Sequence, residues 1–169
     1  MNSFVDYITK DDLTMLTDLY ELTMSASYFD NKKFEQATFD LFIRKLPPNR
    51  SYFLFAGLEQ VLFFLEKMRF SQKHIEFLKE EGFKDEFLDY LKNYKFTGNV
   101  SAVPEGTIVF PDEPLIRIIA PIIDAQLVET LLFNTINLQT MIATKASRVV
   151  AAARGKRVIR VWFKERTRS

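Results

Sequence analysis

The feature that most constrains the fold of this chain is a change in the period of its apolar residues. Between Leu16 and Tyr28 they recur at the three- and four-residue spacing of a helix, which predicts a helix over roughly 18–29. From residue 37 to residue 44 apolar and polar side chains alternate, which predicts a strand with one mostly buried face. A chain that passes from helix to strand in this way favours an α+β fold.

The same two periods divide the rest of the chain. Helical spacing returns at Leu58–Leu65, after Ser71 and at Phe87–Tyr94, and strand candidates follow at Val100–Val103, Thr107–Phe110 and Leu115–Ile119. We expect these three strands to form a compact antiparallel group. A helical region then runs from Pro121 to about Ala153. Because its roughly 30 residues are long for one helix, we expect a break between Asn134 and Asn137.

The composition excludes several kinds of site. The chain has no cysteine, so it can form neither disulfides nor thiolate metal sites, and His74 is its only histidine, so we expect no zinc site. His74 itself, in a polar helix start, is expected at the surface. The chain contains no stretch of about 18 uninterrupted apolar residues, so we expect no membrane span, and the acidic first residues argue against a signal peptide. We therefore expect a cytoplasmic protein.

Charge is distributed unevenly along the chain. Residues 1–144 carry 14 basic and 21 acidic side chains, whereas residues 145–169 carry nine basic side chains and one acidic one. Near the end, Trp162 and Phe163 stand among arginines and lysines, a pattern that can stack on bases and neutralise phosphates. This pattern supports one alternative to an enzyme, a non-catalytic interaction module or nucleic-acid-binding module that uses the basic C-terminal tail.

Five short segments occur in an order that resembles a known family. They read TDLYELTM at 17–24, FDLFIRKLP at 39–47, FAGLEQ at 55–60, AVPEG at 102–106 and QTMIATKASRV at 139–149. No single segment is diagnostic, but in this order and at these intervals they resemble the opening part of a nicotinate phosphoribosyltransferase. The resemblance runs from about Leu16 to Ile159.

This resemblance implies a fold and an activity. Residues 1–120 would form the N-terminal mixed α/β domain with a small antiparallel sheet, and residues 121–159 the first helices leading into an incomplete α/β barrel. Enzymes of this family join nicotinate to the ribose of phosphoribosyl pyrophosphate and form nicotinate mononucleotide for NAD biosynthesis. The resemblance further implies ATP and Mg²⁺ as cofactors of the full-length enzyme, and a homodimer.

The resemblance also implies site residues. Tyr20 would line the pyridine ring of nicotinate, since a phenol offers a flat apolar face and a polar hydroxyl; a core tyrosine on the apolar stripe of its helix is the alternative. Arg44, with Lys45 beside it, and Lys145 and Arg148 on the last helix are weaker candidates for contacts to a carboxylate or phosphate. For these the alternative is a solvated basic surface. No catalytic residue and no metal ligand is assigned.

The match ends near Ile159. Family members continue there with a segment resembling FGLRR, whereas residues 160–169 form an unmatched basic tail. We interpret this tail as the product of a reading-frame change or of truncation. Because the groups that bind phosphoribose and ATP would lie in the missing part, we expect negligible catalysis from this chain alone.

Overall fold

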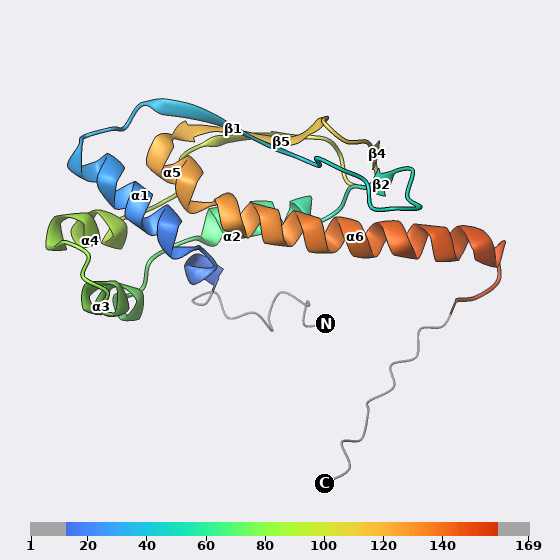
Figure 1. Ribbon diagram of the computed structural model, residues 1–169. Coiled ribbons are helices and arrows are strands. Elements are labelled where there is room, and N and C mark those ends of the chain that lie inside the picture. Colours follow the sequence, from blue (N-terminus) through green and yellow to red (C-terminus); the bar gives the residue numbers. More distant parts are fainter. Residues whose placement is uncertain (1–12, 159–169) are drawn as a thin grey trace, which may run out of the picture.

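Two antiparallel sheets lie along one side of a long C-terminal helix, and shorter helices gather around the N-terminal end of that helix (Figure 1). The computed structural model describes residues 13–158. In chain order the elements are η2 (Leu13–Met15), α1 (Leu19–Asp30), β1 (Gln36–Phe42), β2 (Phe53–Leu54), α2 (Leu58–Lys67), α3 (Gln72–Glu80), α4 (Asp85–Lys92), β3 (Asn99–Ala102), β4 (Ile108–Val109), β5 (Pro114–Pro121), α5 (Ile122–Leu127) and α6 (Glu129–Ala153).

The larger sheet has the strand order β1-β5-β3, with every pairing antiparallel. The expected pairing of β3 with β5 is confirmed, and it sets Val100 opposite Ile118. The expected place of β4 is wrong, because β4 pairs with β2 in a separate two-stranded sheet. The reason is a turn after β3: Gly106 donates to the carbonyl of Phe55, and Phe55 donates to the carbonyl of Thr107, both at 2.9 Å.

The inner face of β1 is only half-buried, although its alternation predicts a mostly buried face. Ala37, Phe39 and Leu41 point to one side of the strand, and each retains partial exposure. The next strand, β5, is packed much more tightly, since Ile116 and Ile118 are each 1% exposed. Phe39 and Leu41 remain accessible because they border a cavity on that side of the sheet.

His74 is buried, so its expected surface position is wrong. Ser71 is the N-cap of α3 as predicted, and its hydroxyl accepts a hydrogen bond from the His74 backbone at 3.4 Å. The imidazole Nδ1 accepts in turn from the Ser71 backbone at 3.2 Å, and the ring lies edge-on to Phe70. The polar helix start therefore turns the imidazole inwards as part of a reciprocal cap.

The long C-terminal helical region breaks at Val128 and not between Asn134 and Asn137. Val128 ends α5 and α6 runs without interruption from Glu129 to Ala153. A new helix needs partners for its first N–H groups, and here a carboxylate from α1 supplies one by accepting from Thr130. Asn134 and Asn137 lie inside α6, which continues through both of them without a break.

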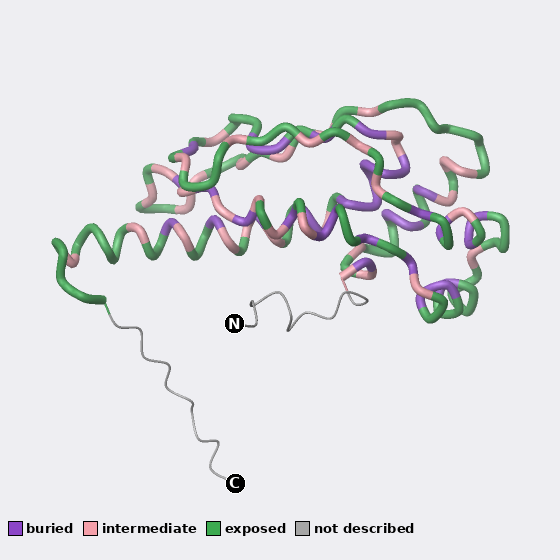
Figure 2. Tube along the Cα trace, turned by 180° about the vertical axis from the view of Figure 1, so that it is seen from behind, coloured by how far each residue is buried: buried purple, intermediate pink, exposed green. Residues whose placement is uncertain are grey.

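Burial along α6 falls from its N-terminal to its C-terminal half (Figure 2). Its buried residues are Leu131, Leu132, Ile136, Thr140 and Thr144, and the residues beyond them are half-buried or exposed. Among residues 13–158, no helix combines the length and the apolar character that a membrane span requires. The N-terminal half of α6 is thus the part that the sheets and the other helices hold in place.

Candidate functional site

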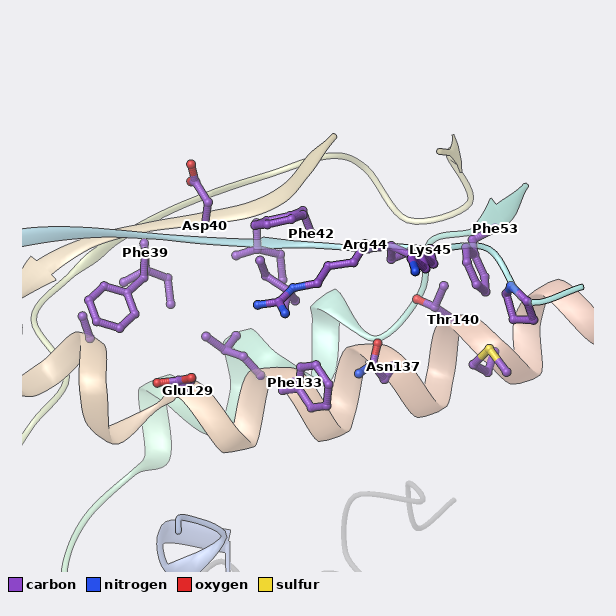
Figure 3. A pocket seen from close by; sticks show the side chains of 18 residues that line it. Phe39, Asp40, Phe42, Arg44, Lys45, Phe53, Glu129, Phe133, Asn137 and Thr140 are labelled. Atoms are coloured by element: carbon purple, nitrogen blue, oxygen red, sulfur yellow. The ribbon is translucent and has the colours of Figure 1, made fainter. Parts of the chain in front are cut away.

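A cavity of about 680 Å³ lies between the larger sheet and α6 (Figure 3). β1 and the segment after it form one wall, and α6 forms the wall opposite. Aromatic and aliphatic side chains supply most of the lining, among them Phe39, Leu41, Phe133, Leu132 and Ile118. Apolar walls with a few polar groups are typical of sites that bind small molecules.

Besides Asp40, five polar side chains border this cavity from different elements. Arg44 and Lys45 follow β1, whereas Glu129, Asn137 and Thr140 belong to α6. Figure 3 shows the Arg44 side chain extending from the segment after β1 into the space above α6, whose Phe133 and Asn137 lie below it. Among the described residues Arg44 has no ion-pair partner, so its guanidinium is available to an anionic group.

Asp40 also touches the cavity but is engaged elsewhere. In Figure 3 its carboxylate points away from α6. The Arg117 side chain of β5 binds it through two hydrogen bonds, at 2.7 and 2.8 Å. This guanidinium holds the pKa of Asp40 below its usual value. Asp40 therefore stays ionised and paired on the far side of the sheet, and Arg44 and Lys45 are left as the cationic side chains that border the cavity.

Hydroxyls of α6 tie the far end of the cavity together. Thr144 accepts a hydrogen bond from the backbone of Leu54 at 2.8 Å, and Thr140 accepts one from the backbone of Ala56 at 3.2 Å. The next residue, Gly57, has a φ of 106°, which strains any larger residue, and a Cβ there would lie only 3.1 Å from the Gln139 side chain. Two of the segments singled out in the sequence, FAGLEQ and QTMIATKASRV, thus meet here.

Glu105 joins a third segment to this region. Its carboxylate accepts hydrogen bonds from the backbone of Gly57 at 2.5 Å and of Leu58 at 2.7 Å. These N–H groups begin α2, where a negative charge is favoured by the helix dipole. The glutamate of the AVPEG segment is therefore a helix cap for the FAGLEQ segment.

Tyr20 lies in the first turn of α1 and is 46% exposed. It is therefore not a core tyrosine. Partial desolvation and the negative charges of Glu129, Glu21 and Asp18 raise the pKa of Tyr20 to about 12. The phenol stays neutral at physiological pH and retains its proton for hydrogen bonding.

The structure does not bring the four predicted contact residues into one pocket. Tyr20 is outside the lining of the cavity that Arg44 borders, although Glu129 lies beside both. Lys145 and Arg148 are exposed further along α6, in a shallow hollow that they share with Arg50. Arg148 is partly engaged, because it donates to the carbonyl of Asn49 at 3.1 Å.

Three polar residues of this region were not predicted as site residues. Glu129 and Thr130 begin α6, and Asn137 faces the cavity. Their positions depend on where α6 starts, which the sequence placed too far along the chain. No local pattern in the sequence marks these three residues as part of a site.

The sequence matches a known family over most of its length. The model of the nicotinate phosphoribosyltransferase (NAPRTase) N-terminal domain matches residues 15–137. The chain belongs to the nicotinate phosphoribosyltransferase family. The family and the α+β fold class expected from the sequence are both confirmed.

Curated relatives carry the name of the same enzyme. The chain is 52% identical over 146 residues to nicotinate phosphoribosyltransferase pncB2 of Mycobacterium tuberculosis, which covers 86% of this chain and 32% of the relative. It is 42% identical over 148 residues to nicotinate phosphoribosyltransferase of Bacillus subtilis, covering 86% of this chain and 30% of the relative. The chain thus spans about a third of the length of these relatives.

Solved structures show the same arrangement. The crystal structure of human nicotinic acid phosphoribosyltransferase superposes with a TM-score of 0.77 at 31% identity, over 84% of this chain and 29% of that one. A nicotinate-nucleotide pyrophosphorylase from Pyrococcus furiosus superposes with a TM-score of 0.65 at 26% identity, over 91% of this chain and 33% of that one.

Proposed function

We propose that this chain is the N-terminal, pyridine-contacting part of a nicotinate phosphoribosyltransferase and that Tyr20 contacts nicotinate. The observation that carries the proposal is the open ring of Tyr20, in a chain that is 52% identical over 146 residues to an enzyme of that name. Phosphoribosyl pyrophosphate is the second substrate of the proposed reaction. NAD biosynthesis in the cytoplasm and a homodimeric assembly belong to the same proposal.

The chemistry of Tyr20 suits an aromatic acid. Its ring can stack on a pyridine, and its hydroxyl, with a pKa of about 12, stays uncharged beside the substrate carboxylate. In the proposed reaction the pyridine nitrogen attacks the ribose carbon as pyrophosphate leaves. Fixing the pyridine against a ring would lower the entropic part of that barrier.

Arg44, Lys145 and Arg148 are proposed as contacts to anionic groups. The Arg44 guanidinium borders the cavity whose opposite wall is α6 and suits a carboxylate or a phosphate. Lys145 and Arg148 offer a second basic surface, separate from Tyr20, for phosphate oxygens. Neither group is assigned a bond-making role.

ATP and Mg²⁺ are proposed as cofactors of the complete enzyme only. Among residues 13–158, no three histidine, cysteine, aspartate or glutamate side chains gather in a way that would hold a metal ion. We therefore assign no residue of this chain to either cofactor and derive no step through them. Because the chain spans about a third of its relatives, we propose that it lacks measurable catalysis when isolated.

Nicotinate binding to the purified 169-residue chain tests the proposal. We expect weak saturable binding, with a Kd on the order of 1 mM, in ligand-observed NMR. Tyr20→Ala should abolish it, whereas Tyr20→Phe should retain the stacked contact, and Tyr52→Phe is the matched control. Binding that survives Tyr20→Ala unchanged would remove the proposed contact. Formation of nicotinate mononucleotide by the isolated chain would refute the claim that it lacks catalysis.

The alternative function, nucleic-acid binding by the basic tail, concerns residues 160–169. These lie outside the described residues, so the structure adds nothing to it. A gel shift with single-stranded DNA at low salt separates the two proposals, since the tail would retard the DNA and a nicotinate site would not.

A further inference from the structure

A buried carboxylate joins the first turns of α1 and α6. Glu21 is 0% exposed, and its Oε1 accepts hydrogen bonds from Thr130, at 2.8 Å from the backbone nitrogen and at 2.7 Å from Oγ1. Its Oε2 accepts from the Thr17 hydroxyl and, at 3.2 Å, from the backbone of Asp18. A buried carboxylate requires such a full set of donors. We call Glu21 and Thr130 the Glu21–Thr130 clamp.

The clamp explains where α6 begins. The backbone N–H of Thr130 belongs to the first turn of α6, so it has no acceptor within that helix. The negative charge of Glu21 satisfies it and also interacts favourably with the helix dipole. The Thr130 hydroxyl additionally lies 3.0 Å from a carboxylate oxygen of Asp18, so the residues on both sides of Tyr20 are fixed to the same threonine.

The hydroxyl end of Tyr20 lies near Glu129, the residue that precedes Thr130 of the clamp. The Glu129 carboxylate acts on the Tyr20 hydroxyl through its negative charge. Glu129 is itself held, because the side chain of the buried Gln126 donates to it at 2.8 Å. The first turn of α1, which carries Tyr20, is therefore fixed to α6 through Asp18 and Glu21, and Glu129 lies near the phenol, whereas the ring remains 46% exposed.

We propose that the Glu21–Thr130 clamp and Glu129 are positioning residues that hold the Tyr20 ring in one orientation for an aromatic carboxylate. The proposal rests on the proposed function for the identity of the ligand. An unrestrained tyrosine would have to be ordered when the ligand binds, which would weaken affinity about two- to tenfold. Restraint before binding removes that loss.

Variants of Thr130 test the clamp. Thr130→Val removes the hydroxyl that Glu21 and Asp18 share, whereas Thr130→Ser keeps it. We expect Thr130→Val to raise the Kd for nicotinate about two- to tenfold and Thr130→Ser to restore it. Thr135→Val, a half-buried threonine of the same helix, is the matched control. Equal affinity of wild type and Thr130→Val would overturn the proposal.

A second measurement needs no ligand and no change inside the clamp. The ring resonance of Tyr20 in ¹³C-tyrosine-labelled protein is assigned by its absence in Tyr20→Phe. Glu129→Ala, at an exposed position, should shift this resonance and broaden it, and Glu129→Gln should do so less because it keeps a polar side chain of the same length near the phenol. Glu86→Ala, in the exposed first turn of α4, is the control.

The two readouts separate the inference from the proposed function. An unchanged Tyr20 resonance in Glu129→Ala, in a protein that is still folded, would overturn the positioning role of Glu129. If wild type binds no nicotinate while the resonance responds as expected, the proposed function fails and the restraint on Tyr20 stands. If Thr130→Val does not fold, the Glu129 variants decide the question because they leave the hydrogen bonds of the Glu21–Thr130 clamp intact.

Discussion

At the scale of single residues, Asp124 carries a charge that the fold disfavours. It is 3% exposed, and its Oδ2 accepts hydrogen bonds from Thr97 at 3.0 Å from the backbone and 2.9 Å from the hydroxyl. Burial outweighs these bonds and raises the pKa of Asp124 above its usual value. The same carboxylate raises the pKa of Tyr90 and Tyr94 nearby, after the larger effect of their own burial.

We predict that Asp124→Asn becomes more stable relative to wild type as pH rises. A raised pKa means that the folded state of the wild type favours the protonated Asp124. The stability that protonated Asp124 contributes is complete below its pKa in the unfolded state and is lost as pH rises through its pKa in the folded state, whereas the asparagine of the variant does not titrate. Urea unfolding of both proteins at pH 4 and pH 7 measures the gap, which is the difference between their free energies of unfolding. Carboxylates common to both, such as Asp40, cancel in the difference. A gap independent of pH would contradict the prediction.

The residues beside Tyr20 show how far sequence reasoning reaches at this scale. Tyr20 and Arg44 could be named because they stand in short segments with a recognisable order. The bonds from Glu21 to Thr130 could not be predicted, because they join a side chain to a helix end far away along the chain. The burial of His74 could not be predicted either, because a polar helix start gives no sign that its imidazole turns inwards. Local patterns carry no information about which helix ends meet.

At the scale of elements, the contact between α6 and β2 depends on one buried hydroxyl. Thr144 is 1% exposed; it accepts from Leu54 at 2.8 Å and donates to the carbonyl of Thr140 at 2.6 Å. β2 has only two residues and one pairing strand, so few other bonds hold it. The hydroxyl thus takes the place of a neighbouring strand.

We predict that Thr144→Val lowers the free energy of unfolding by about 1–3 kcal/mol, because the Leu54 N–H loses its acceptor in a buried place. The Leu54 amide should also exchange with solvent faster than in wild type. Hydrogen exchange followed by NMR, together with urea unfolding, measures both effects. Thr135→Val should change neither, and a Leu54 amide that keeps its wild-type protection in Thr144→Val would contradict the prediction.

Element types were more predictable than their partners. Helices α1 and α3, and strand β1, lie within one or two residues of their expected places because period and caps are local properties. The pairing of β4 with β2 and the start of α6 after Val128 follow from bonds between distant segments, those of Phe55 and of Glu21. No periodicity encodes such bonds.

At the scale of the whole molecule, α6 presents apolar side chains that nothing in the described chain covers. The exposed ones that do not face the cavity beneath β1 include Leu138, Ile142, Val149 and Val150, at 46–61%. They reach into the C-terminal half of the helix, which Figure 2 shows as largely exposed. Exposed apolar surface of this kind promotes association.

We predict that the purified chain self-associates. Its mass in size-exclusion chromatography with light scattering should rise with concentration, and the double substitution Leu138→Glu with Ile142→Lys should reduce the rise. Phe77→Glu, at a similarly exposed position on α3, should leave it unchanged. A constant monomer mass with no binding of an apolar dye would contradict the prediction.

The length of α6 limits which of its residues can serve one small molecule. Glu129 at its start lies beside Tyr20, and Arg148 stands near its end. At about 1.5 Å per residue the two are roughly 28 Å apart along the helix axis. Nicotinate and a phosphorylated ribose together are far shorter than that. One bound substrate therefore cannot contact both ends of α6 of the same copy. If Tyr20 and the basic pair Lys145 and Arg148 both take part in the reaction, the two ends of α6 must contribute to different sites.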